Sequence, residues 1–169
     1  MNPRNDTLLL SWGNPGRRDD GLGPALTKAL ESDTPPGVTV ETDYQLQVER
    51  AADVAEYRRV IFVDADRSGA APFWVRRLRP GNSKMRFSTH SVSPETVLAL
   101  SRELFEAEPE AWLLGVRGYD FDGFGEGLSE RAGDNLEAAL RFIEAFCRED
   151  TVKAETPRAR SPRDCEGEL

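Results

Sequence analysis

The turn that follows the first apolar segment constrains this chain most. Residues 7–12, Thr-Leu-Leu-Leu-Ser-Trp, form an apolar run, and residues 13–23, which include four glycines, come directly after it. A helical pattern begins near Pro24. A buried strand, a turn and a helix in this order are typical of an open α/β sheet, in which sites form at the carboxyl ends of the strands. Residues 13–23 are therefore the first place to look for chemistry.

This turn combines conformational freedom with negative charge. Asn14-Pro15-Gly16 is typical turn chemistry, because proline fixes φ and Gly16 is expected to take the left-handed position. Asp19 and Asp20 follow at the predicted helix start, where the helix dipole favours carboxylates. The spacing matches neither the dinucleotide fingerprint nor the P-loop, and two carboxylates would repel a phosphate. We therefore do not expect nucleotide binding here.

Strand and helix patterns alternate along the rest of the chain. Beyond the first strand, strands are predicted at 38–42, 59–64, 73–79 and 111–116, the third of these at a sheet edge. Helices are predicted at 24–30, 45–57, 94–105 and 130–147, with Ser93 and Ser129 as N-caps of the last two. Such alternation favours an α/β fold with a parallel-rich sheet that helices cover on both faces.

Length and composition limit the class of protein. The chain has 169 residues, which suggests one domain, expected at 1–149; the apolar periodicity then stops, and 150–169 are predicted to be a disordered polar tail. A formal net charge of −8 argues against a nucleic-acid partner. The sequence contains neither a long apolar run nor a secretory signal, and Cys147 and Cys165 imply no disulfide framework. We expect a cytoplasmic protein without membrane contact.

Three separate loops are expected to bring polar side chains to one edge of the sheet. Asp19 and Asp20 follow the first strand, Asp64 ends the strand at 59–64, and His90, the only histidine, precedes a helix. Carboxylates and an imidazole suit a divalent transition metal, and three ligands with open positions describe a reactive site. A purely structural role remains open for each residue. Such aspartates also cap helices and turns, and a lone histidine is more often a surface residue.

A long loop with aromatic residues follows the last predicted strand. Residues 117–127 contain Tyr119, Phe121 and Phe124 among glycines and aspartates. An exposed aromatic loop at the carboxyl end of a strand suggests a surface for a partner or a substrate. Packing of the rings over the sheet edge is the alternative.

With these motifs in place, the sequence resembles the hydrogenase maturation endopeptidases. That family opens with a strand and the pattern G-x-G-N-x-x-x-x-D-[DE]-x-x-G, which residues 11–23 match except that Ser11 replaces the first glycine. Val63-Asp64-Ala65 and Ser88-Thr89-His90 resemble the family's aspartate and histidine motifs. The segments 114–116 and 127–129 resemble its last strand and the start of its final helix. The likeness covers residues 7–148.

The resemblance implies a three-layer α/β/α sandwich with a mostly parallel sheet, of the phosphorylase/hydrolase-like kind. It implies an aspartic-type endopeptidase that removes a C-terminal extension from the large-subunit precursor of a [NiFe] hydrogenase after nickel insertion. Asp20, Asp64 and His90 would contact the nickel of that precursor, which would act as a recognition element; no organic cofactor is implied. A metal-bound water, Asp19 or Asp20 could serve as the base. We expect a monomer that acts in the cytoplasm.

Two alternatives come from other classes. Gly13-Asn14-Pro15-Gly16 also resembles the opening of peptidyl-tRNA hydrolases, but that family needs a histidine soon afterwards, and residues 17–23 contain none. The third hypothesis is a non-catalytic chaperone that binds a metal-loaded partner. Shortening of the precursor distinguishes the endopeptidase from this chaperone.

Overall fold

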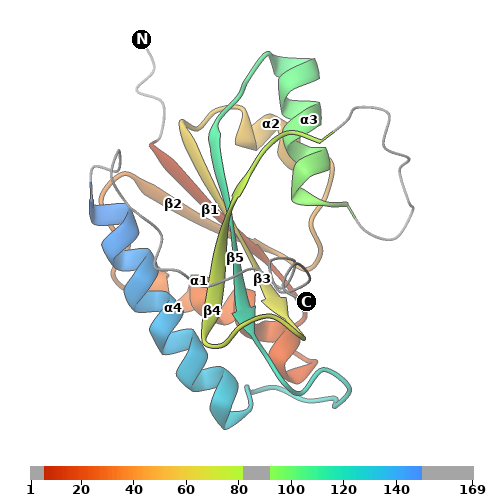
Figure 1. The fold of residues 1–169 in the computed structure, drawn as a ribbon, viewed down its shortest axis with the longest axis vertical. Coiled ribbons are helices and arrows are strands. Elements are labelled where there is room, and N and C mark those ends of the chain that lie inside the picture. Colours follow the sequence, from red (N-terminus) through yellow and green to blue (C-terminus); the bar gives the residue numbers. More distant parts are fainter. Residues whose placement is uncertain (1–5, 82–91, 150–169) are drawn as a thin grey trace, which may run out of the picture.

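A central five-stranded sheet organises the computed structural model, which describes residues 6–81 and 92–149 (Figure 1). The strand order is β2-β1-β3-β5-β4. Strands β1, β2, β3 and β5 run parallel, and β4 pairs antiparallel with β5 at one edge. The strands are β1 (Thr7–Trp12), β2 (Val38–Asp43), β3 (Arg59–Asp66), β4 (Phe73–Leu78) and β5 (Glu110–Arg117).

Helices cover both faces of the sheet, so the predicted three-layer α/β/α fold is confirmed (Figure 1). One face packs against α1 and α4, and the other packs against α2 and α3. A short 3-10 helix, η1, precedes α1 directly. The helical segments are η1 (Arg18–Gly21), α1 (Leu22–Glu31), α2 (Arg50–Val54), α3 (Pro94–Phe105) and α4 (Glu130–Arg148).

The apolar strands are buried because alternate side chains enter the two layers. Leu9, Ile61 and Val63 lie in the core under α1 and α4. Leu10 and Phe62 lie in the core under α2 and α3. A continuous apolar run thus fills both interfaces of a parallel sheet, as expected for strands without a solvent-facing side.

Two local predictions are wrong. The helix predicted over 45–57 shrinks to α2, because the chain before it forms a turn, in which the Arg50 N–H donates to the Gln47 carbonyl. Arg50 also forms ion pairs with Asp43 and Asp53. Gly16 does not take the left-handed conformation; Arg18 does, with φ of 51°. The N-caps Ser93 and Ser129 are confirmed, since each side chain accepts a hydrogen bond from a backbone N–H of its helix.

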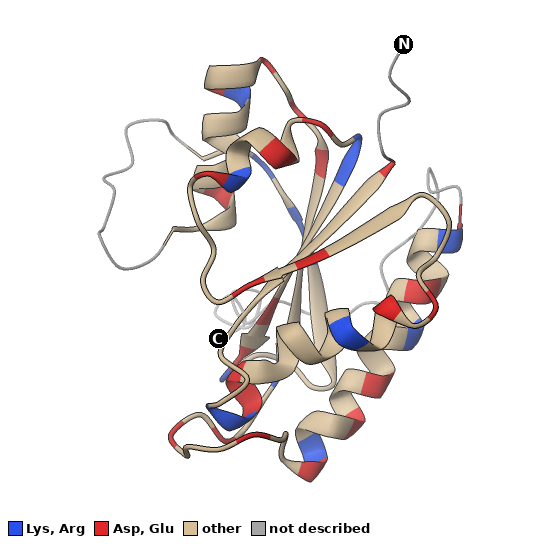
Figure 2. Ribbon diagram, turned by 180° about the vertical axis from the view of Figure 1, so that it is seen from behind, with Lys and Arg blue, Asp and Glu red and all other residues tan. Residues whose placement is uncertain are grey.

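Several predictions fall outside the described residues. The proposed tail at 150–169, Cys165 and His90 belong to this group. Among the helices that the structure does describe, none has the length and apolar character needed to cross a membrane. In the view of Figure 2, lysine and arginine positions are interspersed with aspartate and glutamate positions over the helices and loops, rather than gathered on one element.

Candidate functional site

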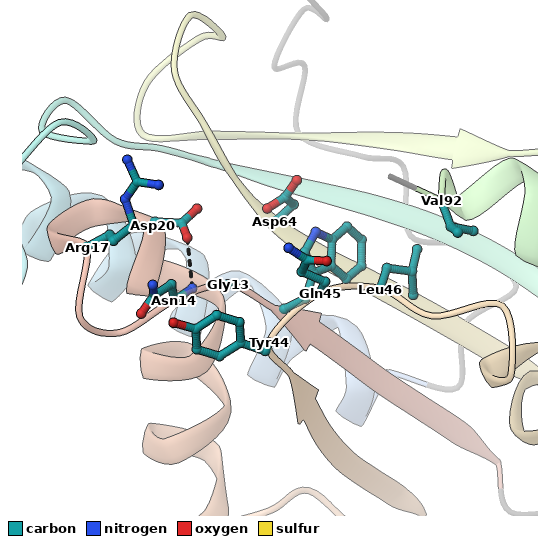
Figure 3. Close-up of a pocket in the computed structure, with 10 residues that line it drawn as sticks. Gly13, Asn14, Arg17, Asp20, Tyr44, Gln45, Leu46, Asp64 and Val92 are labelled. Atoms are coloured by element: carbon teal, nitrogen blue, oxygen red, sulfur yellow. Dashed lines mark hydrogen bonds between the residues drawn. The ribbon is translucent and has the colours of Figure 1, made fainter. Parts of the chain in front are cut away.

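The motif loop after β1 is folded around Asn14 and Asp20. The Asn14 side-chain oxygen accepts a hydrogen bond from the Gly16 N–H at 2.8 Å, which closes the turn. The Asn14 N–H in turn donates to Oδ2 of Asp20 at 2.8 Å (Figure 3). The Arg17 N–H donates to the Asn14 carbonyl at 3.1 Å, so the loop returns on itself before η1 begins. The asparagine of the motif therefore shapes the turn and orients the Asp20 carboxylate.

Two glycines allow this loop to lie directly against the first helix. Gly13 has φ of +145°, and a Cβ there would lie 2.0 Å from the Asp20 carbonyl oxygen. A Cβ at Gly23 would lie 2.5 Å from the carbonyl oxygen of Trp12. Larger side chains at these positions would push η1 and α1 away from the end of β1. The glycine spacing of the motif is thus a packing requirement of the site.

Asp64 comes to the same edge through the register between β1 and β3. Ser11 pairs with Val63 in the parallel ladder, so Asp64 lies beside Trp12, the last residue of β1. Burial raises the pKa of Asp64 to about 7, and the charges of Asp20 and Asp66 add to this. Hydrogen bonds from the Ala65 backbone and the Trp12 side chain act in the opposite direction. Asp64 therefore holds a proton readily at neutral pH when no cation is near.

Asp20 and Asp64 face one pocket of about 330 Å³ (Figure 3). The two carboxylates come from η1 and β3, and they point toward the same space. Residues of the motif loop, the loop after β2 and the segment before α3 complete the wall. Ten residues line the pocket: Trp12, Gly13, Asn14, Arg17, Asp20, Tyr44, Gln45, Leu46, Asp64 and Val92.

Asp19 is not among the lining residues. Its side chain is fully buried and accepts hydrogen bonds from the backbone N–H groups of Tyr119 and Asp120 and from Ser129. Burial alone would raise the pKa of Asp19, but these bonds outweigh it and hold the pKa below its usual value. The adjacent aspartates of the motif thus have separate tasks: Asp20 faces the pocket, and Asp19 joins the motif to the loop before α4.

Asp66, two residues beyond Asp64, is also used structurally. Its carboxylate accepts hydrogen bonds from the Trp74 indole N–H and, at 3.2 Å, from the Ser68 N–H. The indole of Trp74 packs over Gly115 of β5, where a Cβ would overlap the ring. Asp66 therefore fixes the edge strand β4 against β5.

The predicted ligand His90 cannot be placed with the two aspartates, because it lies outside the described residues. Val92, which the structure does describe, lines the pocket. Within 6–81 and 92–149, no group of three His, Cys, Asp or Glu side chains is arranged to hold a metal ion. The described part of the site thus supplies two carboxylates.

The sequence reasoning missed Arg17, Tyr44 and Gln45 as pocket residues. Tyr44 and Gln45 follow β2, which pairs with β1 in parallel, so their place at the carboxyl edge follows from the strand order. The helix predicted over 45–57 conceals this place, because it assigns Gln45 to a helix instead of to the loop after β2. The rule that strand ends share one edge would have found both residues once β2 was placed next to β1.

The aromatic residues of the loop at 117–127 differ in exposure. Some pack over the sheet edge, and one is free to form a surface for a partner or substrate. Phe121 is buried beneath the Arg67 guanidinium, and Tyr119 packs against the core under α4. Phe124 is 85% exposed. Packing therefore accounts for the first two rings and leaves Phe124 on the surface.

The architecture is shared with solved structures of hydrogenase maturation peptidases. The hydrogenase maturating endopeptidase HybD from E. coli aligns with a TM-score of 0.70 and 24% identity over 94% of this chain and 99% of its own. The [NiFe] hydrogenase maturation protease HycI from Thermococcus kodakarensis aligns with a TM-score of 0.64 and 20% identity, covering 87% and 95% of the two chains.

The fold is that of the hydrogenase maturation endopeptidases. A hydrogenase 2 maturation peptidase from Thaumarchaeota archaeon has a TM-score of 0.60 at 22% identity, with 85% of this chain and 99% of that chain covered. At such identities the likeness establishes the architecture. No protein-family model matches the chain, and no curated protein sequence matches it.

Proposed function

We propose that this chain is an endopeptidase that removes a C-terminal extension from the nickel-loaded large-subunit precursor of a [NiFe] hydrogenase. One observation carries the proposal: Asp20 and Asp64, from separate elements, face one pocket at the carboxyl edge of the sheet. The fold around them is the one found in proteins named hydrogenase maturation endopeptidases. The two chains are also of similar length, since the alignment covers 94% of this chain and 99% of HybD.

The nickel belongs to the substrate in this account. Asp20 and Asp64 offer oxygen ligands, and His90 would add an imidazole nitrogen. Only Ser91 stands between His90 and Val92, a lining residue of the pocket, which supports this assignment. A ligand set that is incomplete on its own binds metal weakly until the precursor supplies the remaining ligands. Recognition would then require nickel in the precursor.

The carboxylates also suit the chemistry of peptide hydrolysis. An aspartate whose pKa lies near 7, as that of Asp64 does, exchanges a proton at working pH and is suited to general acid–base catalysis. Asp19 does not share this task in our proposal, because its carboxylate is buried and occupied by four hydrogen bonds. An aspartic-type mechanism at Asp20 and Asp64 follows as the working hypothesis.

The peptidyl-tRNA hydrolase alternative gains no support from the site. Residues 17–23, where that family needs a histidine, contain none. Charges of both signs are interspersed on the helices and loops visible in Figure 2. A tRNA partner would favour a basic face. We propose a cytoplasmic monomer whose partner is the precursor protein, with no nucleic acid or membrane involved. A chaperone without cleavage would use the same pocket.

A processing assay with site variants tests this function. The purified chain is mixed with the nickel-loaded precursor, and the precursor mass is read before and after incubation. Asp20→Asn keeps an oxygen that can accept the hydrogen bond from Asn14 but removes the charge, so we expect processing to fall about 100-fold or more with the fold intact. His90→Ala should abolish processing. Normal processing by either variant contradicts the site assignment, and binding without any mass loss by the wild type favours the chaperone.

A further inference from the structure

Hydrogen bonds fix the loop between β5 and α4 onto the motif loop. The Gly125 N–H donates to the Gly16 carbonyl at 2.8 Å, and the Arg18 N–H donates to the Gly125 carbonyl at 3.1 Å. The Asp19 N–H donates to the Asp120 carbonyl at 2.9 Å. Residues 16–19 and 120–125 therefore run together as a short pair of backbone segments beside the pocket.

The Asp19 side chain adds further hydrogen bonds between the motif loop and the loop that joins β5 to α4. Its carboxylate binds the loop at Tyr119 and Asp120 and again at Ser129, so both ends of the loop are fixed. The Arg18 side chain adds a hydrogen bond to the Glu126 carbonyl at 3.3 Å. The backbone that carries Phe124 is thus held without any contribution from burial of the ring.

Phe124 nevertheless stands in solvent. It is more exposed than any other large hydrophobic side chain of the described residues, at 85%. Its one described ring contact is with Arg17, whose guanidinium carbon lies 5.7 Å from the ring centroid. An exposed aromatic ring on a fixed backbone loses little conformational freedom on binding, which is the property of an interface anchor.

A second exposed aromatic residue, unlike Phe124, lies at the pocket itself. Tyr44 is 63% exposed and lines the pocket together with Arg17 (Figure 3). The Gly13 N–H donates to the Asp43 carbonyl at 3.1 Å, which fixes the backbone next to Tyr44. Tyrosine, phenylalanine and arginine are enriched at the centres of protein–protein interfaces. Tyr44 and Arg17 at the pocket, together with Phe124 against Arg17, therefore form an exposed surface, called here the aromatic rim.

We infer that the aromatic rim is the docking surface for the folded body of the precursor whose C-terminal segment enters the pocket. This inference rests on the proposed function. Arg17 and Tyr44 line the pocket, whereas Phe124 does not line it and contacts Arg17 instead. A peptide confined to a pocket of about 330 Å³ would leave Phe124 free. The ring therefore fits a larger partner that is continuous with the peptide.

Substitution of Phe124 separates docking from chemistry. Phe124→Ala removes the ring at a site where the fold has no need of it, and we expect the KM and the Kd for the nickel-loaded precursor to rise about tenfold, with kcat changing less than about twofold. Phe124→Trp should restore most of the affinity. Leu104→Ala is the matched control, because Leu104 is 67% exposed on the last turn of α3, next to the amino end of β5 rather than the pocket. It should match the wild type.

The outcomes distinguish the docking surface from the proposed activity. If the wild type shortens the precursor and Phe124→Ala does so with unchanged KM and Kd, the docking surface is wrong and the activity stands. If the wild type binds the precursor without shortening it and Phe124→Ala weakens that binding, the docking surface stands and the activity is wrong. If the wild type does not bind the precursor, or if Phe124→Ala alters only self-association in size-exclusion chromatography, the docking surface is overturned.

Discussion

The carboxylate of Asp19 accepts two hydrogen bonds from Ser129, one from the backbone N–H and one from the hydroxyl, each 2.7 Å long. The same Ser129 oxygen accepts a hydrogen bond from the Ala132 N–H and caps α4. The motif after the first strand is therefore joined directly to the start of the last helix. In the sequence, Asp19 has the pattern of a helix cap. In the structure, it joins two segments that lie 110 positions apart.

Asp19→Asn should destabilise the protein by about 3 kcal/mol, because an amide nitrogen replaces one acceptor and faces N–H donors in a buried place. Urea denaturation followed by circular dichroism measures the free energy of unfolding. Asp122→Asn in the exposed part of the same loop is the control and should stay within about 0.5 kcal/mol of the wild type. Equal stabilities of the two variants would show that the buried carboxylate is dispensable.

The lowered pKa of Asp19 also predicts how stability depends on acid. Because its folded pKa lies below the unfolded value of about 3.9, its contribution is complete above that value and is lost as the pH falls through the folded pKa. The stability difference between the wild type and Asp19→Asn should therefore shrink below about pH 4. Denaturation curves at pH 7, 4 and 3 measure it, and a constant difference would refute this origin.

Gly13→Ala should destabilise the protein by about 2–4 kcal/mol and reduce processing, since the added methyl group meets the Asp20 carbonyl and φ is unfavourable for alanine. Gly133→Ala is the matched control in α4, where a Cβ meets nothing within 4 Å. That change should stabilise the protein by about 0.5–1 kcal/mol. Thermal melting of both variants checks the contrast, and similar melting temperatures would contradict it.

Much of this arrangement follows from the sequence, and the rest depends on long-range contacts. The apolar runs at β1 and β3 predict buried strands, and neighbouring strand ends bring Asp20 and Asp64 to one edge. Local pattern could not separate Asp19 from Asp20, because the donors that bind Asp19 lie about 100 residues later. The helix predicted over 45–57 is longer than α2, since the turn before Arg50 leaves no mark in the apolar periodicity. The placement of His90 stays a prediction.

Asp64→Asn should stabilise the isolated protein at pH 8 by up to about 4 kcal/mol, about 1.4 kcal/mol for each unit by which the pKa of Asp64 is raised, and abolish processing. The folded pKa of about 7 exceeds the unfolded value, so the wild type loses stability as the pH rises from about 4 through 7. The asparagine stays neutral and avoids that loss. Urea midpoints at pH 5 and pH 8 measure the effect; a difference between variant and wild type that does not grow with pH would contradict the raised pKa.

Deletion of residues 150–169 should leave the melting temperature within about 2 °C of the full chain, because the segment lacks core periodicity. The truncated chain should also process the precursor normally. Differential scanning calorimetry and the processing assay check the two parts. A large loss of stability would show that residues beyond 149 complete the domain.

The most direct test compares a nickel-loaded with a nickel-free large-subunit precursor, each incubated with the purified wild-type chain and weighed by mass spectrometry. We predict a fixed C-terminal loss from the nickel-loaded precursor and none from the nickel-free one. Asp20→Asn is the paired control and should leave both precursors at full length. Absence of cleavage in the nickel-loaded precursor would contradict the peptidase, and equal cleavage of both would contradict nickel as the recognition element.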